Sequence, residues 1–142
     1  PTEIVVEEIL KKENFDLIIL IQATNLFLKS YHLDKAIKKL IFQKKYNSLL
    51  SVVSSKFFIW QNNNKNEIFS KNYNFKKRPR SQDIKDKEYI ENGSFYIFYK
   101  KNFLKYKNRL HGKIAYYKMP KISLIEIDDN EDLLLVKKLK TK

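Results

Sequence analysis

The stretch Asp16-Leu17-Ile18-Ile19-Leu20-Ile21 places five aliphatic residues in a row after one acid. A run of this length is too short for a helix and is typical of a strand covered on both faces in a parallel sheet. Residues 33–41 carry apolar side chains at helical spacing, and residues 48–53 repeat the pattern of a buried strand. Strand, helix and strand in this order predict a right-handed βαβ unit.

The rest of the chain continues the alternation of strands and helices. Apolar patterning and turn residues predict a helix from Thr2 to Leu10, an aromatic strand over 57–60 with a loop at 61–64, a strand over 94–98 after an Asn92-Gly93 turn, a short helix over 100–106, strands over 113–117 and 124–128, and a helix over 130–139. Residues 70–91 predict no regular element, and so long a loop is usually functional or wrongly assigned. The alternation predicts one α/β domain over residues 1–142.

The composition bounds the function classes. A formal net charge of +13 arises from 29 basic and 16 acidic residues, but 26 of the basic residues are Lys, and Ile and Asn are also abundant. An AT-rich genome imposes that bias on any protein, so we expect a solvated basic surface without a nucleic-acid partner, a basic nucleic-acid-binding domain being the alternative. The absence of Cys excludes thiol catalysis, and the presence of only two Gly excludes a Gly-rich phosphate loop within these residues. No apolar run approaches the roughly 20 residues of a membrane-spanning helix, and we expect a cytoplasmic protein without a membrane partner.

Two carboxylates suggest a metal site near the end of the chain. Glu126 and Asp128 are two residues apart on a predicted strand, so their side chains are expected on the same face. Carboxylates at the C-terminal edge of a strand form a hard-oxygen site suited to Mg²⁺, and open α/β sheets bind ligands at that edge. The alternative is that Asp128 or Asp129 caps the last helix and that Glu126 lies in solvent.

Two further segments are candidates for ligand binding. The run Arg78-Pro79-Arg80-Ser81-Gln82-Asp83 contains two of the three Arg residues, and Arg offers a planar fork for phosphate or carboxylate. An ordinary charged surface is the alternative for this run. Gln22, Thr24 and Asn25 follow the first buried strand, where polar side chains reach a ligand at the sheet edge, although a simple loop explains them equally well.

Several segments in order resemble the acylneuraminate cytidylyltransferases, which make CMP-sialic acid and its relatives. The matching segments are residues 20–26 (a QPTSPL-like loop), 34–37, 47–53 (DSLLSVV-like), 80–83 (R-x-Q-D), 91–98 (ENGxFYIF), 108–114, 119–120 and 126–133. The resemblance covers residues 3 to 139, and its specificity comes from the order of the segments.

The resemblance implies that the anomeric hydroxyl of a nonulosonic acid attacks the α-phosphate of CTP, that pyrophosphate leaves, and that Mg²⁺ offsets the growing charge. The positions that match the family's functional residues are Glu126 and Asp128 as metal ligands, Gln22, Asn25, Arg80, Gln82, Asn92 and Tyr96 as substrate-binding residues, and Gln22 and Arg80 in catalytic roles. Arg80 is expected to pair with the carboxylate of the sugar acid.

The resemblance also implies a fold and an assembly. We expect a three-layer, Rossmann-like sheet of the nucleotide-diphospho-sugar transferase type, and a homodimer in which residues 57–90 form an arm for dimerisation and substrate binding. The sequence departs from the family at Glu126, where Asp is frequent, and at Ala23, Leu26 and Leu28, which replace two prolines and an arginine.

The family's N-terminal phosphate-binding loop has no counterpart in these residues. The resemblance therefore predicts a C-terminal portion, incomplete at its N-terminus, that does not turn over CTP alone. A noncatalytic remnant that binds a sugar acid or dimerises is the alternative.

Overall fold

The computed structural model describes residues 2–63, 65–84 and 88–140. The chain, expected to be one domain with an arm, divides into two compact units. We call residues 1–53 and 91–142 the main unit, and residues 54–90 the inserted unit, because they lie between two halves of the main unit in sequence. Each unit is described by itself.

The main unit contains a sheet and four α-helices. Its elements are α1 (Thr2–Lys12), β1 (Leu17–Ile21), α2 (Ser30–Phe42), β2 (Ser48–Ser55), β5 (Glu88–Tyr99), α3 (Lys100–Tyr106), β6 (Ile114–Lys118), the 3₁₀ helix η3 (Lys121–Leu124) and α4 (Asn130–Lys140), with β2 and β5 continuing in sequence into the inserted unit. The predicted elements at 16–21, 33–41, 48–53, 100–106, 113–117 and 130–139 are thus confirmed within one to three residues at each end. None of the described helices is long and apolar enough to cross a membrane.

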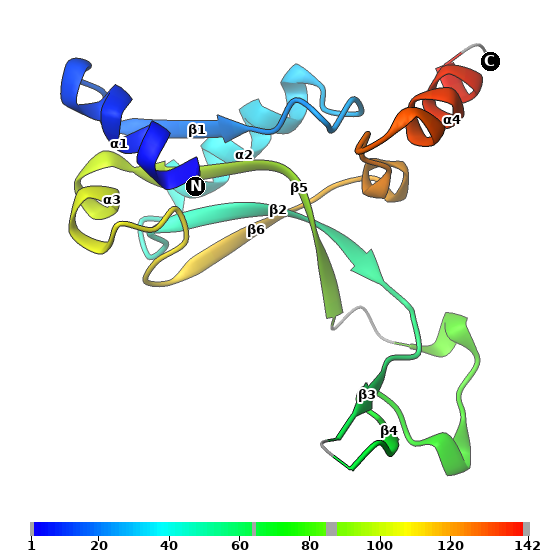
Figure 1. Cartoon of the computed structure of the whole chain (residues 1–142). Helices are drawn as coiled ribbons and strands as arrows, with labels where there is room; N and C mark the ends of the chain where they lie inside the picture. The colour runs from blue at the N-terminus through cyan, green and yellow to red at the C-terminus, as the bar shows by residue number, and fades with distance from the viewer. Residues whose placement is uncertain (1, 64, 85–87, 141–142) are drawn as a thin grey trace. The chain divides into compact units, whose positions relative to one another are not determined.

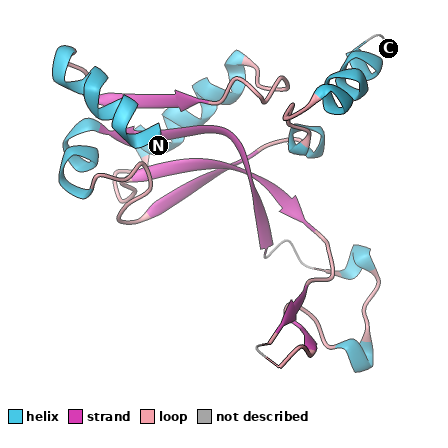
Figure 2. Cartoon of the chain, viewed as in Figure 1, coloured by secondary structure: helices cyan, strands magenta, loops and turns pink. Residues whose placement is uncertain are grey.

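The sheet is mixed, with strand order β1-β5-β2-β6. Strand β1 pairs antiparallel with β5 from Leu17↔Tyr99 to Ile21↔Phe95, whereas β2 pairs parallel with β6. The expected parallel pairing of β1 is therefore wrong. Strands β1 and β2 point the same way, but β5 lies between them and pairs antiparallel with β1 (Figure 2). An apolar run specifies a strand, but the strand that pairs with it is decided by the whole sheet.

Helices cover both faces of the sheet (Figure 1). Alternate residues of β5 serve the two faces: Phe95 and Ile97 pack in a cluster with Ala36 and Leu40 of α2, and Phe98 packs in a second cluster with residues of α1 and α3. Because these aromatic and aliphatic side chains are fully buried, β5 is the centre of both hydrophobic cores. The expected three-layer α/β architecture is confirmed.

Two local expectations are wrong. Residues 124–128 are not a strand, since η3 ends at Leu124 and irregular backbone leads to α4. Hydrogen bonds from Ser123 N–H to the carbonyl of Pro120, at 3.0 Å, and from Ile125 N–H to Ile122, at 3.1 Å, hold this segment in successive turns. In addition, Gly93 lies inside β5 rather than in a turn before it, with a positive φ of 60°.

The inserted unit has a two-stranded antiparallel hairpin and two 3₁₀ turns. These are β3 (Trp60–Asn62), β4 (Ile68–Ser70), η1 (Phe75–Lys77) and η2 (Ser81–Asp83). Strand β3 begins three residues later than the strand predicted over 57–60. Gln61 and Asn62, which were expected in a loop, therefore pair with β4. Among residues 56–63, 65–84 and 88–90 no side chain is buried.

Candidate active site

The end of β1 and the segment before α4 meet beside β5. The Gln22 N–H donates to the carbonyl of Ser94 at 3.2 Å, which continues the pairing of β1 with β5 by one residue. The Ile127 N–H donates to the carbonyl of Thr24 at 3.1 Å and fixes the segment before α4 against the loop after β1. Three segments distant in sequence thus meet at one edge of the sheet.

Gln22 and Glu126 converge over the backbone of Gly93. A Cβ atom built on Gly93 would lie 2.3 Å from Gln22 Oε1 and 2.7 Å from Glu126 Oε1. Both side-chain oxygens therefore approach one point, and they do so from different segments of the chain. The structure brings together two of the residues that the resemblance assigns to substrate and metal.

Two buried asparagines hold the segments beneath this site. Asn25 is 5% exposed, and its Nδ2 donates to the carbonyls of Ser123, at 2.8 Å, and of Asn92, at 3.2 Å. Asn92 is 2% exposed and its Nδ2 donates to Ser123 Oγ at 2.9 Å. Their Oδ1 atoms are buried and have no hydrogen-bond partner among the described residues. The two amides join the loop after β1, strand β5 and η3; their assignment to substrate stays a prediction.

The carboxylates of Glu126 and Asp128 are close enough to interact. Partial burial raises the pKa of Glu126 above its usual value, and the negative charge of Asp128 raises this pKa further. Glu126 is half-buried and Asp128 is exposed, although neither is on a strand.

A bound cation would relieve this repulsion. Carboxylate and amide oxygens are the donors that Mg²⁺ prefers, so the chemistry of Glu126, Asp128 and Gln22 suits the metal, and its binding here stays a prediction. In the described part of the chain, no group of three or more His, Asp or Glu residues is arranged to hold a metal ion. The candidate ligands are therefore two carboxylates and one amide.

Helix α4 is capped by Asp129, as one of the alternatives predicts. Asp129 Oδ1 accepts hydrogen bonds from the N–H groups of Glu131, at 2.8 Å, and Asp132, at 3.0 Å. Asp132 Oδ2 accepts in return from the N–H of Asp129 at 3.3 Å, which completes a reciprocal cap. The capping side chains are therefore those of Asp129 and Asp132, while Glu126 is not left in open solvent.

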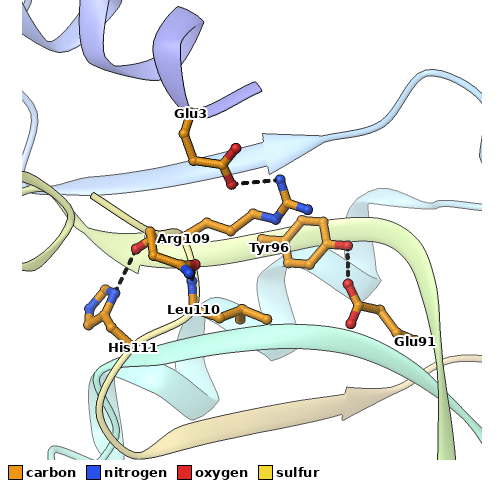
Figure 3. Close-up of polar contacts among 7 residues, drawn as sticks. Glu3, Glu91, Tyr96, Arg109, Leu110 and His111 are labelled. Carbon is orange, nitrogen blue, oxygen red and sulfur yellow. Dashed lines mark hydrogen bonds and ion pairs between the residues drawn. The ribbon is translucent and has the colours of Figure 1, made fainter. Parts of the chain in front are cut away.

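Tyr96 belongs to a polar cluster on the α1 face of β5 (Figure 3). Its hydroxyl donates to the carboxylate of Glu91, and the guanidinium of Arg109 lies 4.4 Å from the centre of its ring. Arg109 Nη1 also lies 3.0 Å from Glu3 Oε1. Burial, with the bond to Glu91, raises the pKa of Tyr96 to about 12, so the residue stays a neutral donor near neutral pH. Its role in sugar binding stays a prediction.

Arg80 and Gln82 belong to the inserted unit. The fork of Arg80 faces Asp83, with Nε 2.9 Å from Oδ2 and Nη2 3.4 Å from Oδ1, and both side chains are exposed. Gln82 lies in η2. The site over Gly93 is therefore built from the main unit alone.

The sequence patterns missed Gly93 and Ser123 as parts of this site. The Asn92-Gly93 pair predicts a turn, and nothing in its residue type marks Gly93 as part of a ligand site. Ser123 gives no signal in the sequence, since its role depends on buried contacts with two asparagines from other segments.

No family model matches the chain. It is 37% identical over 133 residues to "N-acylneuraminate cytidylyltransferase B" of Danio rerio, a match that covers 92% of this chain and 31% of the relative. It is 36% identical over 120 residues to "N-acylneuraminate cytidylyltransferase" of Oncorhynchus mykiss, covering 82% of this chain and 27% of the relative. The chain thus spans about a third or less of the length of these curated relatives.

A solved structure shares the fold. The 4-diphosphocytidyl-2C-methyl-D-erythritol synthase of Anaerococcus prevotii superposes with a TM-score of 0.69 at 15% identity, over all of this chain and 67% of that one. The likeness confirms the Rossmann-like α/β fold.

Proposed function

We propose that this chain is a member of the acylneuraminate cytidylyltransferase family, since it is 36–37% identical to two proteins of that name, and that its site over Gly93 serves the transfer of CMP from CTP to a nonulosonic acid, with release of pyrophosphate. The observation that carries the proposal is the convergence of Gln22 and Glu126 on one point beside β5. Both residues were assigned to substrate and metal from the sequence, and they come from segments more than 100 residues apart.

In this proposal Glu126 and Asp128 hold Mg²⁺, which when bound would offset negative charge on the phosphates of CTP. The pKa of Glu126 is raised first by partial burial and then by the charge of Asp128, and both disfavour the bare carboxylate, so a bound cation would stabilise its charged form. Gln22 Oε1 can accept a hydrogen bond from a sugar hydroxyl. Separately from this site, the family pattern assigns Arg80 of the inserted unit to the carboxylate of the sugar acid. The family pattern also assigns Asn25, Gln82, Asn92 and Tyr96 to the substrates. In this structure Asn25, Asn92 and Tyr96 are buried and hydrogen-bonded within the main unit, so their part in substrate binding is a proposal separate from the site over Gly93.

The metal site is tested by Mn²⁺ binding to the purified 142-residue chain, measured by electron paramagnetic resonance. Glu126→Gln and Asp128→Asn should each weaken binding by about tenfold or more, because each removes one anionic ligand. Glu131→Gln is the matched control, since it also removes one negative charge near the start of α4 but at an exposed position outside the site. Equal affinity in all four proteins would refute the metal site.

The reaction is tested with CTP, Mg²⁺ and N-acetylneuraminate by measuring pyrophosphate release and the binding of each substrate. Binding of both substrates with little or no turnover is the expected result for these residues alone. Robust turnover would overturn the expectation that a further phosphate-binding loop is required. Binding of N-acetylneuraminate without any affinity for CTP would instead support a noncatalytic sugar-acid-binding chain.

We also propose a homodimer that forms through residues 57–90. The support is that large apolar side chains of the inserted unit are exposed, among them Ile68 at 65% and Phe75 at 56%. Exposed apolar area of this kind marks interaction surfaces. Ile68→Asp should shift sedimentation towards the monomer without changing Mn²⁺ affinity, and an unchanged sedimentation coefficient would contradict this contact.

A further inference from the structure

We propose that Gly93 is a positioning residue of the site: the absence of a side chain lets Gln22 Oε1 and Glu126 Oε1 face one shared point, where a ligand cation or donor group binds. The inference rests on the proposed function, because the role of the site comes from there. The inference goes beyond the proposed function by assigning a role to Gly93, a residue that contributes no functional group.

The geometry shows how closely the two oxygens approach. The position that a Cβ would take at Gly93 is 2.3 Å from Gln22 Oε1 and 2.7 Å from Glu126 Oε1. Real Cβ atoms essentially never come within 3.0 Å of such neighbours. Any side chain at position 93 therefore displaces at least one of the two oxygens.

Gln22 Oε1 and Glu126 Oε1 also have the same hydrogen-bonding character. Both are hydrogen-bond acceptors, and in the described part of the chain no donor group is hydrogen-bonded to either of them. Two acceptors facing one point are unfavourable unless a cation or a donor lies between them, and a turned Gln22 amide, with Nε2 towards Glu126, would itself be such a donor. The space over Gly93 is thus arranged for a positively charged or hydrogen-bond-donating group.

Gly112 offers a matched control for the backbone. It has a φ of 61°, against 60° for Gly93, so both residues adopt a conformation that L side chains rarely take. A Cβ at Gly112 would also be too close to a neighbour, at 2.3 Å from Asn47 Oδ1. That neighbour is structural, because Asn47 Oδ1 accepts a hydrogen bond from Lys113 N–H at 2.9 Å. The two glycines differ in what lies above them, not in their backbone.

The experiment compares Gly93→Ala with Gly112→Ala in the full chain. Mn²⁺ affinity should fall about tenfold or more in Gly93→Ala and stay within about twofold of the parent in Gly112→Ala. Both variants should lose thermal stability through the same backbone strain, and Gly112→Ala should lose more, because its Cβ would also meet Cγ and Cβ of Asn47 at 2.7 and 3.0 Å. If the parent chain binds Mn²⁺, equal affinity in the two variants would overturn the proposal.

A second measurement works without metal. The side-chain amide signal of Gln22 in a ¹⁵N–¹H spectrum, assigned with Gln22→Ala, should move in Gly93→Ala and stay in place in Gly112→Ala. If the parent chain binds no Mn²⁺ but this signal moves, the proposed metal site fails and the positioning role stands. If the signal does not move, the positioning role fails whatever the metal does.

A double variant covers the case in which Gly93→Ala folds poorly. In Gln22→Ala/Gly93→Ala the nearer of the two displaced oxygens is gone, so the new methyl group meets less obstruction. The Mn²⁺ affinity lost on changing Gly93 should then be smaller than in the parent background, a non-additive result. Stability is not the readout here, because the displaced oxygens are the far ends of flexible side chains and shift at little cost. Strict additivity would show that Gly93 does not act through Gln22.

Discussion

The main unit and the inserted unit are held together in different ways. The main unit has two hydrophobic clusters that meet on β5, with Phe95, Ile97 and Phe98 fully buried. The inserted unit has no buried side chain among residues 56–63, 65–84 and 88–90, and relies on a short hairpin, ring contacts and side-chain-to-backbone hydrogen bonds. Burial of apolar area is the main stabilising term in folding, so the two units should respond very differently to equivalent changes.

The largest difference is expected for phenylalanine truncation. Phe98→Ala should lower the free energy of unfolding of the main unit by about 3–5 kcal/mol, because it opens a cavity in a closed core. Phe69→Ala, at a residue that is 46% exposed in β4, should change it by less than about 0.5 kcal/mol. Urea unfolding measures both, followed by far-UV circular dichroism for the main unit and by Trp60 fluorescence for the inserted unit. A loss of similar size in the two variants would show that the inserted unit has a core after all.

Two bridging asparagines give a smaller contrast. Asn25→Ala leaves the buried carbonyls of Ser123 and Asn92 with one donor fewer, and should cost about 1–3 kcal/mol. Asn72 also bridges segments, accepting from Ile59 N–H at 2.9 Å and donating to the carbonyl of Phe57 at 2.8 Å, but it is only half-buried.

The effect of Asn72→Ala should therefore be local. Trp60, the only tryptophan, lies in the inserted unit, so its fluorescence reports that unit alone. In urea unfolding of Asn72→Ala we expect a lower midpoint in the Trp60 fluorescence transition, which reports the inserted unit. The circular dichroism transition of the main unit should be unchanged. A shift of both transitions by the same amount would mean that the two units unfold together.

The site itself lowers the stability of the main unit at neutral pH. Since the pKa of Glu126 is raised on folding, the folded state binds this proton more tightly, and stability falls as the pH rises from the ordinary value of 4.5 through the folded-state value. Glu126→Gln should raise the melting temperature slightly at pH 7, with the gain vanishing well below pH 4.5. Thermal scans over pH 3–8 measure this, with Glu131→Gln as control. A gain that persists in acid would show another origin for the effect.

A small effect is expected for a cation–π contact of the inserted unit. The guanidinium of Arg78 lies 3.9 Å from the centre of the Phe58 ring, on an exposed surface. Arg78→Ala should reduce the stability reported by Trp60 by about 0.5–1 kcal/mol, whereas Arg78→Lys should retain part of it. No change in the Trp60 transition would show that this contact is not populated in solution.

The local parts of the fold could be predicted from the sequence. The apolar runs at 17–21 and 48–53 specify strands, and acids at the start of 130–139 specify a helix start, because these signals act within a few residues. The position of β5 between β1 and β2 could not be predicted, since pairing depends on residues far apart in the chain. Apolar and acidic residues alternate in segment 124–128, as they do in a strand. The backbone around Ser123 instead forms hydrogen-bonded turns, so the intrinsic strand propensity of the segment is not realised.

The candidate site shows the same division. Glu126 and Gln22 were found because their residue types and positions match a family pattern, and the structure brings them together. The reason that they meet, an empty Cβ position at Gly93, depends on tertiary structure and a positive φ. A residue that acts by having no side chain leaves no chemical signal in the sequence.

The strand pairing of the main unit has a consequence for how the chain folds. Pairing β1 with β5 joins Leu17 to Tyr99, and the inserted unit lies within the loop that must close. The entropy of closing a loop grows only with the logarithm of its length, about 0.6 kcal/mol for each doubling. A segment without a core therefore adds little to the equilibrium cost of forming the sheet. The inserted unit should instead affect the folding rate, because sheets whose strands are distant in sequence form slowly.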